Sequence, residues 1–148
     1  MTPLDATDEA ILAALEEDAS RTARQIGDLV GLSQPAAYRR IKRLESEGVI
    51  AGYRLEVDRA ALGYEVVVFL GVKLAAKGRA SMEDFERAVV AIPEVQLVQH
   101  VLGVYDYRLR VIAKDLADFE RVLRRRIMTL PGVGDVESNV LLSEELRR

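Results

Sequence analysis

The sequence predicts an α+β protein with a helical N-terminal domain and a C-terminal domain of strands and helices. The chain has 148 residues, enough for one ordinary domain or two small ones. Near residue 50 the apolar residues stop recurring at helical steps, and β-branched residues begin to alternate. A junction of the form apolar-Pro-x-Val occurs twice, at residues 92–95 and 130–133, which indicates a repeated unit. We therefore expect domains at 1–50 and 64–148, joined by a strand hinge at 51–63.

Composition excludes several classes of protein. Hydrophobic residues make up 49% and charged residues 30%, with 4 Pro and 10 Gly, which excludes a disordered or fibrous chain. The chain has no Cys and one His, His100, so disulfides, zinc fingers and His-based metal cages are excluded, and we expect no metal and no cofactor. The longest apolar run, Val66 to Val72, is too short to span a membrane, and no basic leader precedes it. A cytoplasmic protein without a membrane partner is expected.

Two helices are predicted before residue 32. Thr7 is a suitable N-cap for the first helix. Thr22 and Gln25 have the spacing of a capping box for the second, and Gly31 provides its left-handed end. The apolar face of the first helix is formed by Ile11, Leu12 and Leu15, and that of the second by Ile26, Leu29 and Val30.

The third predicted helix follows a tight turn. Ser33 can cap it, Pro35 lies in its first turn, and Gly48 ends it. Its buried stripe consists of Ala37, Ile41 and Leu44. Three short helices with a turn before the third predict a helix-turn-helix whose last helix enters the major groove of double-stranded DNA.

The outward face of this third helix carries the candidate DNA contacts. At about 100° per residue, the polar side chains lie opposite the buried stripe. We expect Gln34, Tyr38 and Arg39 to reach base edges, and Lys42 and Arg43 to contact phosphates. Ser33 leaves its backbone N–H available to a phosphate, whereas Arg40 lies beside the stripe and should pack or pair with an acid. The candidate residues are Ser33, Gln34, Pro35, Tyr38, Arg39, Lys42 and Arg43.

Charge distribution distinguishes this face from an ordinary solvated helix. The whole chain has a net charge of -3, and residues 1–60 hold 8 Lys and Arg against 11 Asp and Glu. Half of those 8 cations nevertheless lie between residues 39 and 43. A local basic patch in an acidic region favours nucleic-acid binding over general attraction to polyanions.

The C-terminal half predicts the order β-α-β-β-α-β. An exposed connecting strand at 49–57 comes first, and four further strands are expected at 66–74, 95–102, 107–113 and 133–142. A turn at Lys77-Gly78 leads to a helix capped by Ser81 with Asp84 as its partner, and Asp115 caps a second helix that continues through Ile127. This order is that of the ferredoxin-like fold, with two helices on one face of the sheet. The other face is uncovered, so we expect a homodimer to form through it.

The sequence resembles the Lrp/AsnC family of transcription regulators over essentially its whole length. In the N-terminal half the matching residues are Leu4-Asp5, Asp8, Ile11-Leu12, 26–33, 39–45, 48–50 and Gly52-Tyr53; in the C-terminal half they are Gly103, 105–107 and 130–133. The resemblance implies a winged or plain helix-turn-helix, a strand hinge, and an effector domain that dimerises and often assembles dimers into octamers.

The resemblance also implies a small effector, commonly an amino acid, bound between dimers near the turn at 102–107. Gly103 would allow close approach of a ligand, and Asp106 could bind an ammonium group or act only as the cap of a hairpin turn. Val104 replaces an acidic or polar residue of many relatives, so an apolar ligand or none is also open. His100 is expected on the face of Val98 and Leu102, partly buried, as a packed histidine or a ligand contact. The candidate residues are His100, Leu102, Gly103, Val104, Tyr105 and Asp106.

We therefore expect a sequence-specific DNA-binding regulator modulated by a small effector, with no enzymatic activity. Two alternatives are a tetrapyrrole decarboxylase-like enzyme with the same two-domain layout and a metabolite-sensing module without DNA binding. The single histidine gives little support to the enzyme, and the predicted recognition helix argues against the module.

Overall fold

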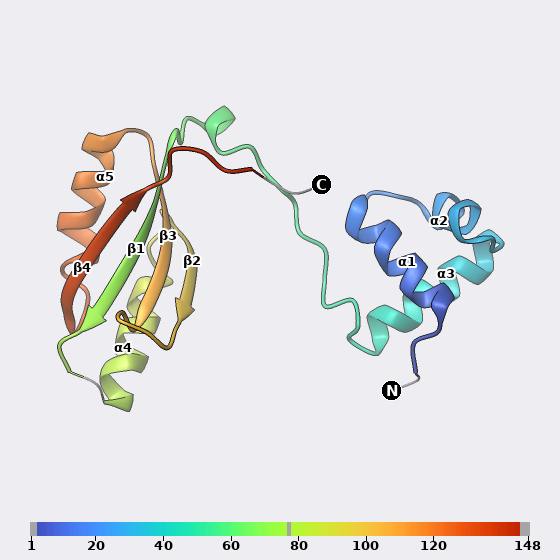
Figure 1. The fold of residues 1–148 in the computed structure, drawn as a ribbon, viewed down its shortest axis with the longest axis horizontal. Helices are drawn as coiled ribbons and strands as arrows, with labels where there is room; N and C mark the ends of the chain where they lie inside the picture. Colours follow the sequence, from blue (N-terminus) through green and yellow to red (C-terminus); the bar gives the residue numbers. More distant parts are fainter. Residues whose placement is uncertain (1–2, 77, 146–148) are drawn as a thin grey trace. The chain divides into compact units, whose positions relative to one another are not determined.

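The computed structural model describes residues 3–76 and 78–145, which form two compact units. The chain divides into Met1–Glu56 and Val57–Arg148, and each unit has a hydrophobic core of its own. Figure 1 shows the helical N-terminal unit and the C-terminal unit of strands and helices. Within the described residues, no helix combines the length and the apolar character needed to cross a membrane.

The N-terminal unit contains three helices. They are α1 (Ala6–Glu17), α2 (Ala23–Val30) and α3 (Gln34–Ser46). Their apolar faces meet in a core in which the predicted stripe of α3 is buried, and the core residues are Ile11, Leu15, Ile26, Ala37, Ile41 and Leu44. The spacing of apolar residues was therefore sufficient to predict the inner face of each helix, apart from Leu29, which is exposed.

Local signals set most of the helix ends in this unit. Thr22 and Gln25 form the predicted capping box, and Gly31 ends α2 in the left-handed conformation at φ 74°. Ser33 caps α3 by accepting a hydrogen bond from the Ala36 N–H. The predicted cap of α1 was wrong, because Asp5 holds that position instead of Thr7.

The predicted strand at 49–57 is not formed. Residues 51–57 take part in no strand pairing within the described chain, and the only regular element in residues 51–65 is a short 3-10 turn at Ala60–Leu62. Alternation gives a segment the side-chain pattern of a strand, but a strand also needs a neighbour to which its backbone can hydrogen-bond. The hinge at 51–63 is therefore not a strand in this single chain.

The C-terminal unit has the predicted βαββαβ order. Its elements are β1 (Val66–Leu74), α4 (Arg79–Val89), β2 (Val95–His100), β3 (Tyr107–Ala113), α5 (Leu116–Val122), which continues as a π-helical turn at Leu123–Ile127, and β4 (Val133–Val140). All strand pairs are antiparallel, in the order β2-β3-β1-β4. Apolar residues of α4 and α5 pack on the same alternating set of β1 and β3 residues, so both helices cover one face of the sheet (Figure 1).

Three element boundaries in this unit differ from the prediction, and one of them is the end of β4 at Val140 instead of residue 142. Helix α4 begins at Arg79 with Gly78 as its N-cap and no side-chain cap, so Ser81 lies inside the helix and does not cap it. Strand β2 ends at His100, before Leu102. In the turn predicted at Lys77-Gly78 before α4, Lys77 lies outside the described residues.

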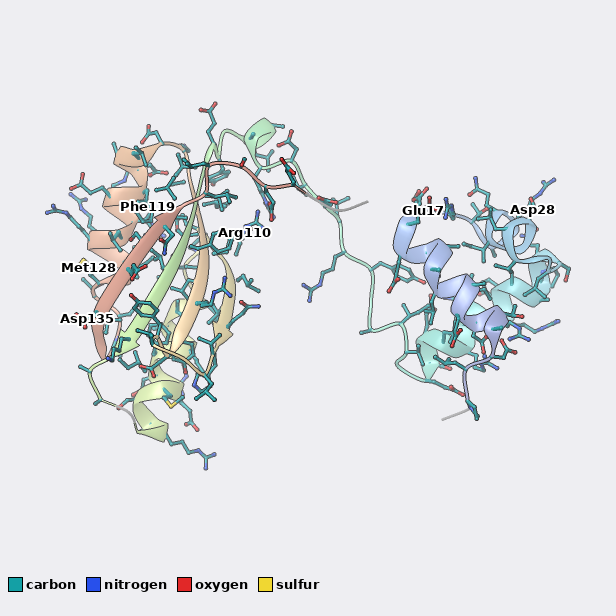
Figure 2. All side chains as sticks on the ribbon, viewed as in Figure 1. Glu17, Asp28, Arg110, Phe119, Met128 and Asp135 are labelled. Carbon is teal, nitrogen blue, oxygen red and sulfur yellow. The ribbon has the colours of Figure 1, made fainter. Side chains whose placement is uncertain are left out.

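No helix of the described residues lies over the second face of the sheet (Figure 1). Figure 2 shows Arg110 and Phe119 on opposite sides of the sheet, with Phe119 in the core beneath α5. Residues of β1 and β3 that alternate with the core residues face the other way, and Phe69 pairs with Arg110 in the register of these strands. The uncovered face thus mixes half-buried apolar side chains such as Val67 and Phe69 with the arginines at 108 and 110.

Candidate DNA-binding surface and effector loop

The turn between α2 and α3 is tight, and one glycine makes it possible. A Cβ atom on Gly27 would lie 2.6 Å from the carbonyl oxygen of Leu32, so a side chain there would push the turn away from α2. The Leu32 N–H donates to the Gly27 carbonyl oxygen at 2.9 Å, which fixes the same approach. This close contact fixes where α3 begins relative to α2.

Most of the predicted DNA contacts share one exposed face of α3. Six of the seven candidates are exposed: Ser33, Gln34, Pro35, Tyr38, Arg39 and Lys42. Tyr38 is 54% exposed, a high value for an aromatic side chain, and Lys42 Nζ lies 5.7 Å from the centroid of its ring. The first turns of α3 therefore present an aromatic ring, an amide and two cations to solvent.

Arg43 does not point outward as the helix geometry predicted. Its Nη2 atom donates to Asp8 Oδ2 at 2.5 Å, and its Nε atom is buried and has no hydrogen-bond partner among the described residues. At about 100° per residue the wheel places Arg43 on the polar side of α3, but the buried Asp8 on α1 draws its long side chain inward. Arg40, predicted to pair with an acid, donates from Nη1 to Asp8 Oδ1 at 2.9 Å and to Asp5 Oδ2 at 2.7 Å.

Asp8 is the buried acid that joins α1 to α3. It is fully buried, and its carboxylate accepts hydrogen bonds from two arginines of α3 and from the Asp5 N–H. Burial alone would raise the pKa of Asp8, but the hydrogen bonds from Arg40, the Asp5 backbone and Arg43 outweigh it and hold that pKa below its ordinary value. Sequence reasoning missed this role, although Asp8 precedes Ile11 and Leu15 by three and seven residues and so shares their buried face.

A second acid lies beside Lys42 at the end of α3. Glu45 Oε2 accepts a hydrogen bond from Lys42 Nζ at 2.6 Å, and Glu45 Oε1 accepts one from the Tyr53 hydroxyl at 2.9 Å. Neither Glu45 nor Tyr53 was singled out from the sequence as part of the site. The three-residue spacing of Lys42 and Glu45 on a helix is a signal that could have found the pair.

The loop at 101–106 holds five of the six predicted effector residues. Leu102, Gly103 and Val104 are exposed, and a Cβ atom on Gly103 would meet no atom within 4 Å. Asp106 Oδ2 accepts a hydrogen bond from the Leu74 N–H at 2.9 Å, and the Asp106 N–H donates to the Val72 carbonyl oxygen. The Asp106 side chain therefore ties the loop to the end of β1.

Tyr105 and His100 lie on opposite faces of the sheet. The Tyr105 ring covers Gly71, where a Cβ atom would come within 2.6 Å of it, and the Tyr105 hydroxyl hydrogen-bonds to Glu137. Beside it, Phe69, Arg108 and Asn139 help to line a hollow of about 340 Å³. His100 instead stacks on Tyr107, with ring centroids 4.9 Å apart, on the face that α4 covers. Within one chain the six residues therefore do not converge.

His100 is also more exposed than predicted. The alternation of β2 placed it correctly on the face of Val98, opposite the buried residues of β3. It is nevertheless exposed, because β2 is an edge strand and its last residue is covered from one side only. Within residues 3–76 and 78–145, no group of His, Asp and Glu side chains could hold a metal ion.

Comparison with known proteins assigns both units. Residues 4–45 match the AsnC-type helix-turn-helix domain, and residues 67–148 match the Lrp/AsnC ligand binding domain. An HTH-type transcriptional regulator of Mycobacterium tuberculosis is 40% identical over 148 residues, which cover 100% of this chain and 98% of that protein. The proline dehydrogenase transcriptional activator of Rhizobium radiobacter is 36% identical over 139 residues, 94% of this chain and 89% of that protein.

Solved structures match the whole fold. A transcriptional regulator from Neisseria meningitidis, crystallised as a complex with L-Met, matches with a TM-score of 0.93 and 28% identity, covering 98% of this chain and 94% of that chain. An AsnC family transcriptional regulator from Agrobacterium tumefaciens matches with a TM-score of 0.89 and 28% identity, covering 97% and 94%. These matches give no support to a decarboxylase or to a sensing module without DNA binding.

Proposed function

Because the chain belongs to the Lrp/AsnC family of DNA-binding transcriptional regulators, we propose that it recognises a pseudo-palindromic DNA site through α3 and responds to a small effector. The family is one of regulators and not of enzymes. The observation that carries the proposal is the exposed face of α3 around Tyr38, Arg39 and Lys42, which projects from a turn that Gly27 keeps close to α2. The proposed site of action is the cytoplasm.

We propose a division of roles along α3. Gln34, Tyr38 and Arg39 lie in its first two turns and contact base edges, whereas Lys42 lies one turn later and contacts a phosphate. Ser33 and Pro35, at the start of the helix, lie against the sugar-phosphate backbone. Arg43 has one donor committed to Asp8, so its main role is to hold α3 on α1, and any phosphate contact would use its remaining N–H groups.

We propose that the effector binds at the loop of residues 101–106 and that an amino acid is the first class to test. The L-Met complex of the Neisseria meningitidis regulator supports this class. Leu102 and Val104 offer exposed apolar surface, and one carboxylate oxygen of Asp106 already accepts the Leu74 N–H. His100, on the other face of the sheet, could contact the same ligand only if a second copy of the chain completes the site.

We propose that the uncovered face of the sheet is a homodimer interface and that dimers can assemble further, up to an octamer. Half-buried Val67 and Phe69 support an apolar contact there, and Arg108 and Glu137 provide charges of both signs on the same face. Light scattering of the purified protein should give a mass that is a multiple of 16.5 kDa, at least twofold. A monomer mass at micromolar concentration would contradict the proposal.

One titration tests the function as a whole. The protein is titrated by fluorescence anisotropy onto a labelled duplex from its own upstream region and onto a random duplex of equal length, at physiological salt, with and without each of the common amino acids. We expect tighter binding to the upstream duplex and a change in that preference with at least one amino acid. Equal affinity for the two duplexes would contradict a sequence-specific regulator, and indifference to every amino acid would contradict the proposed effector class.

A further inference from the structure

The cation of α3 that is placed to contact phosphate is already paired with a carboxylate. Lys42 Nζ lies 2.6 Å from Glu45 Oε2, and the ring of Tyr38 lies on another side of the same ammonium group. Lys42 is 54% exposed and Glu45 27%, so the pair lies at the surface and is open to solvent on the lysine side. The positive charge of Lys42 is therefore offset by an acid one helical turn further along.

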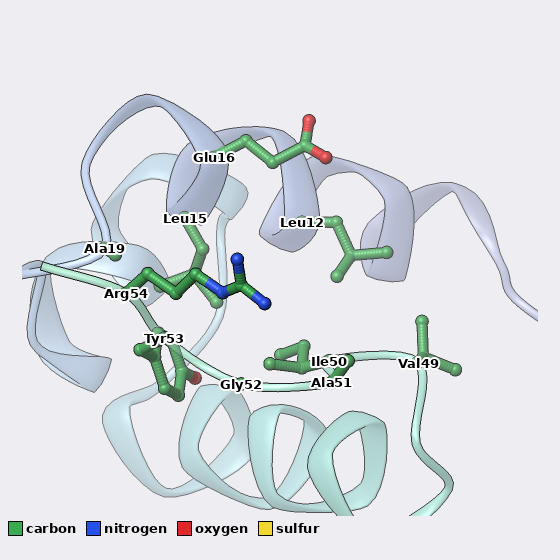
Figure 3. Close-up of a pocket in the computed structure, with 10 residues that line it drawn as sticks. All are labelled: Leu12, Leu15, Glu16, Ala19, Val49, Ile50, Ala51, Gly52, Tyr53 and Arg54. Carbon is green, nitrogen blue, oxygen red and sulfur yellow. The ribbon is translucent and has the colours of Figure 1, made fainter. Parts of the chain in front are cut away.

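A residue outside α3 holds that carboxylate in place. The Tyr53 hydroxyl donates to Glu45 Oε1 at 2.9 Å, so each oxygen of the carboxylate has its own donor. Figure 3 shows Tyr53 beside α3, in the segment that runs from Val49 to Arg54. The same segment borders a cavity of about 250 Å³ against Leu12 and Leu15 of α1, and it lies between the two helices in this view. Tyr53 is thus a positioning residue for Glu45.

The two hydrogen bonds keep both partners charged. The bonds from Lys42 and Tyr53 hold the pKa of Glu45 below its ordinary value, and the bond to Glu45 raises the pKa of Lys42. At neutral pH the pair therefore has no net charge. A phosphate that approaches Lys42 must compete with Glu45 for the ammonium group and then lies near a carboxylate.

We propose that Glu45, positioned by Tyr53, limits the affinity of α3 for the DNA backbone and so lowers binding to all sequences alike. The inference rests on the proposed placement of α3 against DNA. Phosphate contacts supply the salt-dependent, sequence-independent part of binding, and base contacts supply the preference. By weakening one phosphate contact, Glu45 leaves occupancy of DNA more dependent on Gln34, Tyr38 and Arg39.

The test compares Glu45→Gln with a matched variant, Glu9→Gln. Both remove one negative charge from a helix of the N-terminal unit, but Glu9 is exposed on α1 and is remote from Lys42 in the sequence. Affinities for a labelled random duplex and for the upstream duplex are measured by anisotropy over a series of salt concentrations. One added phosphate contact should steepen the slope of log affinity against log salt by about 0.9 and strengthen binding about fivefold near 0.15 M salt.

Two further variants separate the pairing from a general charge effect. In a Lys42→Ala background, Glu45→Gln should give no more gain than Glu9→Gln, because no ammonium group is left to release. Tyr53→Phe keeps the ring and removes the donor, so it should give a smaller gain in the same direction and a smaller change of slope. Thermal unfolding followed by circular dichroism identifies any variant whose effect comes from loss of folding.

The outcomes are distinct. A gain for Glu45→Gln that is equal on both duplexes, exceeds that of Glu9→Gln and requires Lys42 supports the proposal. A gain no larger than that of Glu9→Gln, a gain that persists without Lys42, or a loss of affinity for the upstream duplex alone would overturn it. Failure of the unmodified protein to bind either duplex would overturn the DNA-binding role of α3 itself, which the other outcomes leave intact.

Discussion

Replacing Asp8 by alanine is expected to unfold the N-terminal unit and leave the C-terminal unit folded. The change removes the acceptor of Arg40 Nη1 and Arg43 Nη2 and leaves two guanidinium groups close together without that buried counter-charge. Removing one partner of a buried ion pair costs about 3–5 kcal/mol. That loss is comparable to the total stability of about 5 kcal/mol of a marginally stable small domain. Because the two units have separate cores, urea unfolding should show the loss of one transition, and DNA binding should disappear with it.

Glu9→Ala provides the control for Asp8→Ala. Glu9 lies in the same turn of α1 but is exposed, so its replacement should change the stability by no more than about 0.5 kcal/mol. If Asp8→Ala unfolded in urea like the unmodified protein, the carboxylate would not be the connection between α1 and α3 that the structure indicates.

Low pH should also destabilise the N-terminal unit, because it protonates the carboxylates that bind the arginines of α3. The pKa of Asp5 is lowered chiefly by the Arg40 guanidinium, and that of Asp8 is lowered despite its burial. A carboxylate whose pKa is lower in the folded state than in the unfolded state stabilises the fold at any pH above its unfolded-state pKa. That stability is lost as the pH falls from the unfolded-state pKa through the folded-state pKa. The N-terminal transition of the unmodified protein should therefore move to lower urea below about pH 4. A transition that stayed constant between about pH 5 and pH 2 would contradict the lowered pKa values of Asp5 and Asp8.

Arg39→Ala should reduce the preference for the upstream duplex, whereas Lys42→Ala should weaken binding to every duplex alike. Arg39 is exposed in the second turn of α3, where a guanidinium can bond two acceptors of a guanine edge. Loss of one such contact should lower affinity for the preferred site about 5- to 150-fold and relax its sequence preference. Lys42, as a phosphate contact, should leave the ratio of the two affinities unchanged and reduce the slope against log salt.

Both variants are compared on the same upstream and random duplexes. Arg24→Ala, an exposed change on α2, controls for the loss of one positive charge in this unit outside α3. Equal loss on the two duplexes for both variants would contradict the division of α3 into base contacts and phosphate contacts. A selective effect of Lys42→Ala with a uniform effect of Arg39→Ala would reverse the assignment.

The sequence predicted the features that local signals determine. The box of Thr22 and Gln25, the glycine after α2 and the cap at Ser33 each act within a few residues, and all three are present. The change to β-branched, apolar segments likewise predicted the four strands that pair in the C-terminal unit. The apolar residues recur with the period of a helix, about 3.6 residues, or of a strand, 2 residues, and these periods can be recognised within each segment alone.

The features that failed depend on contacts distant in the sequence. Arg43 was assigned to the outward face because a helical wheel shows one helix alone, and its partner Asp8 lies 35 residues earlier. The strand expected at 49–57 has an alternating pattern but no neighbouring strand in this chain. The burial of His100 was overestimated because the order of strands, which places β2 at an edge, cannot be obtained from the alternation of β2 itself.

The segment at residues 51–57 also has a consequence for the DNA sites that such a protein can use. Its seven residues pair with no strand of the described chain, but the Tyr53 hydroxyl donates to Glu45 of α3, so only residues 54–57 are held by no hydrogen bond to a helix or strand of the described chain. Fully extended, these four residues reach roughly 13 Å. In the proposed homodimer, two helix-turn-helix units joined to the shared C-terminal units by such segments would keep a high effective concentration for the second half-site over a range of spans. Operators whose half-sites differ modestly in spacing would then be bound by one and the same dimer.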